Sequence, residues 1–191
     1  MSIFDIFSKK KEKGSLEPDY ERLTPDEVEL EFRLRQNALK HHTGQRLVED
    51  MKIIELLAKK YKYVPAIHFC LDNIDDAEEY ERIGAELGDA VCLYRYYDLN
   101  RIKNMKPDEA EKCIGRAVSA GASSAYLTLG DYYRLIGDEK RALDVYRLAH
   151  SISVRGAADK IAEFDPDLGA ELLSQPTKSA KTSSLYKRLK G

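Results

Sequence analysis

The sequence predicts an all-α protein, a short superhelix (solenoid) of helix–turn–helix repeats, and three observations favour that fold. Apolar residues recur at helical spacing along the 191-residue chain, without convincing β alternation. Turn and capping residues separate segments that are each long enough for one helix. Small residues recur every 32 or 33 positions, at Ala77, Ala110 and Ala142. Because one helical hairpin cannot bury its apolar face alone, this repetition predicts stacked neighbours.

Two helices longer than the rest are expected at the start of the chain. Thr24 can cap the first helix, Pro25 suits its first position, and Glu27 completes a capping box. This helix should run to about His42. The second helix should span 46–61. Its buried stripe is expected to comprise Leu47, Met51, Ile54 and either Leu57 or Ala58.

Shorter helices are expected after Pro65, because proline interrupts the backbone hydrogen bonding of a helix. Their expected ranges are 66–73, 76–87, 89–102, 107–120, 123–136, 139–151, 156–164 and 166–174. The expected organisation is a flexible leader at 1–18, a helical pair at 19–64, a repeat region at 65–174 and a disordered basic tail at 175–191.

The segment from Ser123 to Gly156 is the clearest helix–turn–helix unit. Small residues let its two helices approach closely, and tyrosine rings fill the remaining space. The pattern is Tyr126, Leu129, Gly130 and Tyr133 on the first helix, then Ala142, Tyr146 and Ala149 on the second. It resembles the tetratricopeptide repeat, and the turn at Asp138 is similar to that of the related Sel1-like repeat. The resemblance covers about 65–164 and implies a solenoid of stacked hairpins.

The resemblance also implies where a partner would bind. In tetratricopeptide proteins the first helix of each repeat lines a concave groove, which receives a protein or peptide segment. The groove candidates implied here are Tyr96, Leu99, Leu127, Asp131, Arg134 and Leu135, with Cys92 on the same expected face. The alternative is that these positions are merely solvated. The family's carboxylate clamp uses paired Lys and Asn, so Leu127 and Asp131 at those positions argue against that mode of binding.

The formal net charge of −2 conceals an uneven distribution. The first 14 residues carry a net +2 and residues 175–191 a net +5, so the residues between them carry −9. An acidic body repels phosphate, and we therefore expect no nucleic-acid binding through it. The same charge favours a basic segment on a protein partner.

The leader offers a second hypothesis. Apolar residues followed by lysines are typical of a segment that rests on an anionic membrane surface. The candidate membrane contacts are Ile3, Phe4, Phe7, Lys9, Lys10 and Lys11. The alternatives are a flexible leader and a leader that docks on its own solenoid. Membrane contact would make the protein a peripheral tether or assembly factor at the inner face of a membrane, with the basic tail as a second attachment.

No residue pattern indicates catalysis, a cofactor or a metal. The chain has no P-loop and no nucleophile elbow. His68 and Cys70 would point to opposite sides of a helix, and the adjacent His41 and His42 cannot face one metal ion together. The 3 cysteines lack Cys-x-x-Cys spacing, so we expect buried, reduced thiols. With no apolar run of ~18 residues to span a membrane, the sequence predicts a non-catalytic cytoplasmic adaptor.

Overall fold

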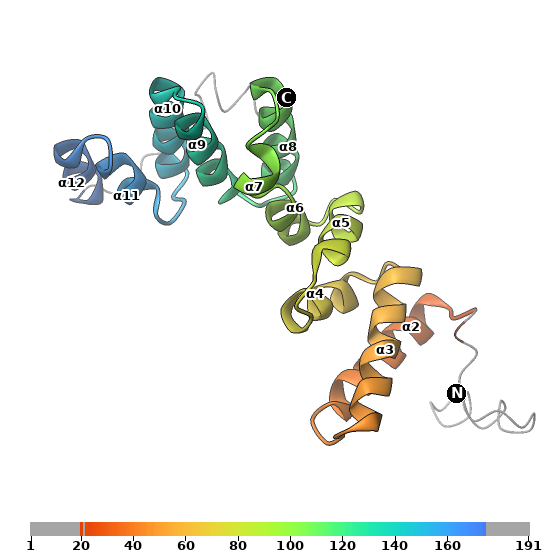
Figure 1. The fold of residues 1–191 in the computed structure, drawn as a ribbon. Helices are drawn as coiled ribbons and strands as arrows, with labels where there is room; N and C mark the ends of the chain where they lie inside the picture. The colour runs from red at the N-terminus through yellow and green to blue at the C-terminus, as the bar shows by residue number, and fades with distance from the viewer. Residues whose placement is uncertain (1–19, 21, 175–191) are drawn as a thin grey trace, which may run out of the picture. The chain divides into compact units, whose positions relative to one another are not determined.

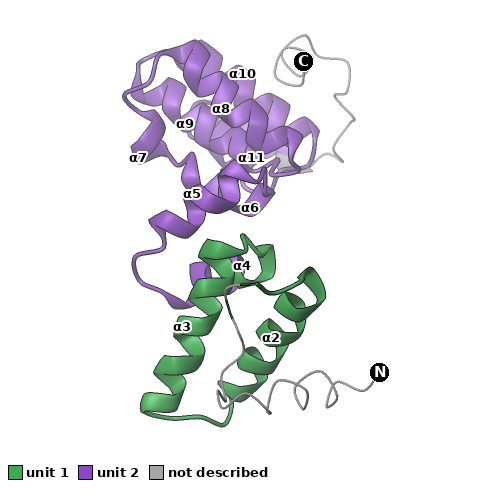
Figure 2. Ribbon diagram, turned by 90° about the vertical axis from the view of Figure 1, so that its right-hand side faces the viewer, with its two compact units in different colours: residues 1–66 green, residues 67–191 purple. Residues whose placement is uncertain are grey.

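The computed structural model describes residue 20 and residues 22–174. Over that part of the chain every regular element is an α-helix and no strand is present (Figure 1), which confirms the all-α class. None of the described helices is long and apolar enough to cross a membrane. The predicted membrane contacts of the leader and the basic tail from residue 175 lie outside the described residues. The chain divides into two compact units at Ala66–Ile67 (Figure 2).

Unit 1 is built on a pair of packed helices. They are α2 (Pro25–Ala38) and α3 (Gln45–Lys60). The predicted capping box forms, because the Glu27 backbone N–H donates to Thr24 Oγ1 and the Thr24 N–H donates to Glu27 Oε2, 2.8 Å away. The helix ends at Ala38 rather than near His42. The reason is that Lys40 and His41 donate their backbone N–H groups to the carbonyls three residues earlier, of Asn37 and Ala38, which forms a turn instead of another turn of α-helix.

A buried polar network joins α2 to α3. Glu31 and Asp50 are only 3% and 1% exposed. Arg35 binds both carboxylates, with Nε 2.7 Å from Glu31 Oε1 and Nη1 2.9 Å from Asp50 Oδ1. His42 Nδ1 lies 2.6 Å from Asp50 Oδ2. Burial alone would raise the pKa of Asp50, but hydrogen bonds from Arg35 and His42 outweigh it and hold that pKa below its usual value.

The buried face of α3 begins one turn later than predicted. Leu47 is exposed, whereas Asp50, one turn later on the same side of the helix, is buried because Arg35 and His42 pair with its carboxylate. Farther along, Ile54, Leu57 and Ala58 are fully buried, and Met51 is partly buried.

Unit 2 begins within α4 (Val64–Asn73) and continues through shorter helices. These are α5 (Glu78–Glu86), α6 (Ala90–Tyr96), α7 (Leu99–Ile102), α8 (Pro107–Ser119), α9 (Ala125–Leu135), α10 (Glu139–Ser151), α11 (Ala157–Ala162) and α12 (Pro166–Ser174). Helices close in sequence pack together: α5 with α6, α6 with α8, α8 with α9, α9 with α10, α10 with α11, and α11 with α12.

The single helix predicted over 89–102 is in fact two helices. Tyr97 leaves the helical conformation, with φ −96° and ψ 50°. Asp98 then caps a new helix, since its carboxylate accepts a hydrogen bond from the Arg101 backbone N–H at 2.9 Å. Asp98 therefore divides the segment into two helices where the apolar periodicity alone predicts one continuous helix.

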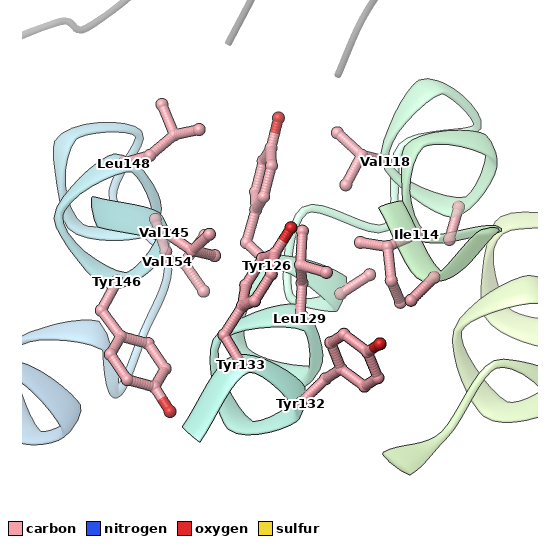
Figure 3. Packing of buried hydrophobic residues seen from close by; sticks show 14 of the residues in the cluster. Ile114, Val118, Tyr126, Leu129, Tyr132, Tyr133, Val145, Tyr146, Leu148 and Val154 are labelled. Carbon is pink, nitrogen blue, oxygen red and sulfur yellow. The ribbon is translucent and has the colours of Figure 1, made fainter. Parts of the chain in front are cut away.

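The core of unit 2 is centred on α9, whose side chains lie between those of α8 and α10 (Figure 3). The predicted close approach at Gly130 is confirmed, because a Cβ at that position would lie 2.6 Å from Tyr146 Cδ1. Ala142 and Ala149 are fully buried on the facing helix. Gly137 adopts φ 80° in the turn between α9 and α10, a conformation that favours glycine.

Candidate partner-binding surface

The candidates on α9 share one face of that helix. Leu127, Asp131, Arg134 and Leu135 follow the spacing i, i+4, i+7 and i+8, which places them along one side. The structure brings this side against α11 and the residues that follow it, through Lys160, Glu163 and Phe164. We call Asp131, Arg134, Leu135, Lys160, Glu163 and Phe164 the α9 surface.

Asp131 holds helices together at the inner part of the α9 surface. Its Oδ1 accepts a hydrogen bond from the Tyr146 hydroxyl at 2.6 Å and lies 2.9 Å from Lys160 Nζ. Burial of the ring, and then the bond to Asp131, raise the pKa of Tyr146 well above its usual value. Asp131 therefore links α9 to both α10 and α11, and its removal would disturb packing as well as any partner contact.

Arg134 lies at the open edge of the α9 surface. Its guanidinium pairs with Glu163 and sits 5.1 Å from the centre of the Phe164 ring. The two charged side chains are 41% and 44% exposed. An ion pair this exposed contributes about 0–1 kcal/mol, so a partner can open it at little cost.

Among the residues that the structure describes, Leu135 is the most exposed large apolar side chain, at 57%. Its neighbour Ile136 is exposed as well. In contrast, Leu127 is partly buried and packs against the core of unit 2, so most of its surface is already used within the chain. On α9, the prediction of an accessible contact fits Leu135 better than Leu127.

The candidates before α8 lie in a different setting. Tyr96 is partly buried, makes an edge contact with Tyr97, and is covered by the Arg101 guanidinium 4.0 Å from its ring centre. Leu99 is partly buried against the core. The expectation that Cys92 shares an accessible face is wrong: its side chain is fully buried, because α6 turns it toward Gly84 on α5.

Sequence reasoning missed half of the α9 surface. Lys160, Glu163 and Phe164 come from the region of the helix predicted near 156–164, which is observed as Ala157–Ala162 with Glu163 and Phe164 just after it. A signal was present, since the spacing i, i+3 and i+4 puts these three side chains on one side of a helical turn. What could not be read from that spacing is that this side meets α9.

A second cluster was also missed, and it consists of metal-ligating residue types. His68 Nε2 lies 2.9 Å from Asp89 Oδ1, and Cys92 Sγ belongs to the same group, with all three ligand atoms within 4.8 Å of one another. From the sequence, His68 was considered together with Cys70 only, two positions along the chain, and that pair was rejected as a metal site. The actual partners lie 21 and 24 positions away, where no local spacing rule applies.

The two clusters differ in what they can do. The α9 surface offers a donor in Arg134, acceptors in Asp131 and Glu163, and an apolar contact in Leu135, which is a combination suited to recognising a polypeptide. The cluster around Cys92 offers nitrogen, oxygen and sulfur ligands. No protein-family model, curated protein or solved structure matches this chain.

Proposed function

We propose that the chain is a non-catalytic adaptor, a short solenoid of tetratricopeptide- or Sel1-like hairpins that binds a protein or peptide segment at the α9 surface. Two features of unit 2 support the repeat. The helices α8 and α10 each have 13 residues and begin 32 positions apart. Their equivalent residues are fully buried in both: Ala110 and Ala142, Ile114 and Tyr146, Ala117 and Ala149.

The exposure of Leu135 beside Arg134 carries the proposal. Leu135 is 57% exposed and does not belong to the core cluster of unit 2, although it ends a well-packed helix. Next to it, Arg134 and Glu163 form an ion pair that a partner can exchange for its own charges. Arginine is one of the residue types enriched among those that contribute most to binding at protein interfaces.

The charge of the chain favours a basic partner segment. Residues 15–174 carry a net −9, so a positively charged peptide would be attracted before contact is made. Glu163 and Asp131 then provide acceptors at the α9 surface itself. Phosphate-rich partners such as nucleic acids are disfavoured by the same field.

Affinity capture from a cell lysate tests the proposal, with three forms of the full chain as bait. The test variant is Arg134→Ala/Leu135→Gln. The matched control is Arg82→Ala/Leu87→Gln, which removes another exposed arginine from an ion pair and another exposed leucine, both on or next to α5. Tyr96 is left intact, because Arg101 packs on its ring and its loss would perturb the fold.

The expected result is a protein retained by the wild type and by the control but lost from the test variant, with circular dichroism showing all three baits equally helical. The proposal is wrong if the test variant retains the same proteins as the wild type. It is equally wrong if both variants lose them, since the loss would then not depend on the α9 surface.

A further inference from the structure

The His68, Asp89 and Cys92 cluster is built by two helices of unit 2. Asp89 is the N-cap of α6 and its carboxylate accepts a hydrogen bond from the Cys92 backbone N–H at 3.0 Å. The cap thus fixes two of the three side chains on the same turn. His68 comes from α4 and reaches Asp89 through its Nε2 atom, 2.9 Å from Oδ1.

The sulfur is held in place by a close approach of α5. A Cβ at Gly84 would lie 2.6 Å from Cys92 Cβ and closer still to Sγ. Only glycine leaves the space that the cysteine side chain occupies. The sulfur therefore lies beneath the cluster, while the His68 and Asp89 side chains, 39% and 17% exposed, form its solvent side.

We propose that His68, Asp89 and Cys92 bind one Zn²⁺ ion through Nε2, a carboxylate oxygen and Sγ, with a water molecule as the fourth ligand. Imidazole, carboxylate and thiolate are the ligands that zinc takes in proteins, at about 2.0–2.3 Å from the ion. Ligands at those distances in a tetrahedron lie about 3.3–3.8 Å apart. The three ligand atoms already lie within 4.8 Å of one another, and the bond between His68 Nε2 and Asp89 Oδ1 is replaced by their bonds to the ion.

The charges and protons of this step balance. Zn²⁺ brings two positive charges, which the Asp89 carboxylate and the Cys92 thiolate neutralise. The thiol proton passes to solvent as the Zn–S bond forms, and the neutral imidazole of His68 binds with its one proton on Nδ1, which leaves the Nε2 lone pair for the ion. Burial, together with the neighbouring Asp89, raises the pKa of the Cys92 thiol to about 12. Without a metal the thiol therefore stays protonated and unreactive at neutral pH.

Binding would tie α4 to α6, and this role is separate from partner recognition by α9. A metal that binds the folded state and not the unfolded one raises the melting temperature. The shift should be several degrees when free Zn²⁺ is at about 100 times its Kd.

The test is a Co²⁺ titration of the full chain, followed by Zn²⁺ competition. Cobalt substitutes for zinc in such sites, and a Co–thiolate bond gives an intense charge-transfer band in the near ultraviolet. We expect this band in the wild type and its disappearance when Zn²⁺ is added. Cys92→Ala should lack the band, whereas Cys113→Ser, the matched control at a partly buried cysteine on α8, should keep it.

Zinc affinity is then measured by competition with a chromophoric chelator. His68→Ala should weaken binding by at least about 100-fold, because the loss of outer partners alone typically costs 10- to 100-fold. The melting temperature should rise with Zn²⁺ in the wild type and in Cys113→Ser, and should not rise in Cys92→Ala.

Two results would overturn the proposal. One is a wild-type titration without a thiolate band, which would leave the three residues as a helix-capping network only. The other is Zn²⁺ binding that survives His68→Ala unchanged, which would move the ion to other side chains. Neither result depends on Cys92→Ala folding, since the first uses the wild type and the second changes a half-exposed residue.

Discussion

Replacing Gly130 with alanine should destabilise unit 2, although alanine is the better helix former. A Cβ at this position would lie 2.6 Å from Tyr146 Cδ1 and 2.7 Å from Cζ. The Tyr146 ring is fully buried, and its hydroxyl donates to Asp131 Oδ1 at 2.6 Å. The ring therefore cannot swing aside without losing that bond, and the alternative is that α9 and α10 separate.

The magnitude follows from three opposing terms. Forcing extra volume into a packed core costs about 1–3 kcal/mol. Loss of a hydrogen bond to a charged group costs about 1.5–3 kcal/mol. The higher helix propensity of alanine relative to glycine stabilises the helix by about 1 kcal/mol. We expect a net loss of about 2–4 kcal/mol in the free energy of unfolding, since part of the clash is relieved when the bond breaks.

Urea unfolding followed by far-ultraviolet circular dichroism measures this loss, with Tyr146→Leu as the background that removes the ring. There, Gly130→Ala should be neutral or stabilising by up to about 1 kcal/mol, because only the propensity term remains. A Gly130→Ala protein as stable as the wild type, or more stable, would refute the close packing of these helices.

Four other substitutions separate the effects of packing, buried charge and surface contacts. Ala142→Leu should destabilise the fold by about 1–3 kcal/mol through overpacking at a fully buried site, measured by urea unfolding. Arg35→Met should cost about 3–5 kcal/mol in the same assay, because it leaves two buried carboxylates without their cation. Folding lowers the pKa of Asp50, so the ionised Asp50 carboxylate stabilises the fold above the ordinary carboxyl pKa. This stabilisation is lost as the pH falls through the lowered pKa of the folded state. In a plot of stability against pH, Asp50→Asn should therefore reduce the loss of stability in acid. Arg134→Ala should change stability by less than about 1 kcal/mol while weakening partner capture, and unfolding instead would contradict its assignment to the surface.

The sequence predicted the features of this fold that depend on neighbours in the chain. Thr24 and Glu27 form the predicted capping box, because both ends of each hydrogen bond lie within one turn. The helix over 139–151 has the predicted bounds, since Asp138 caps its start and the turn at Gly137 precedes it. The close packing at Gly130 also follows from residue size alone.

The predictions that were wrong have a different cause, because they concern side chains whose surroundings depend on residues far away in the chain. Asp50 displaced Leu47 from the buried face of α3 because Arg35, 15 positions earlier, compensates its charge. Cys92 is buried rather than accessible because α5 places Gly84 against it. The break at Tyr97 is the exception, since the capping side chain of Asp98 was visible in the sequence and was outweighed by the apolar pattern.

The most direct test of the central claim is site-specific photocrosslinking from the α9 surface. A photoreactive amino acid replaces Leu135 in one protein and Leu87, another exposed leucine next to α5, in another. We expect a covalent adduct with one protein from position 135 that is absent from position 87. Identical adducts from both positions, or none from position 135 in a lysate where the wild type captures a partner, would show that the α9 surface is not where the partner binds.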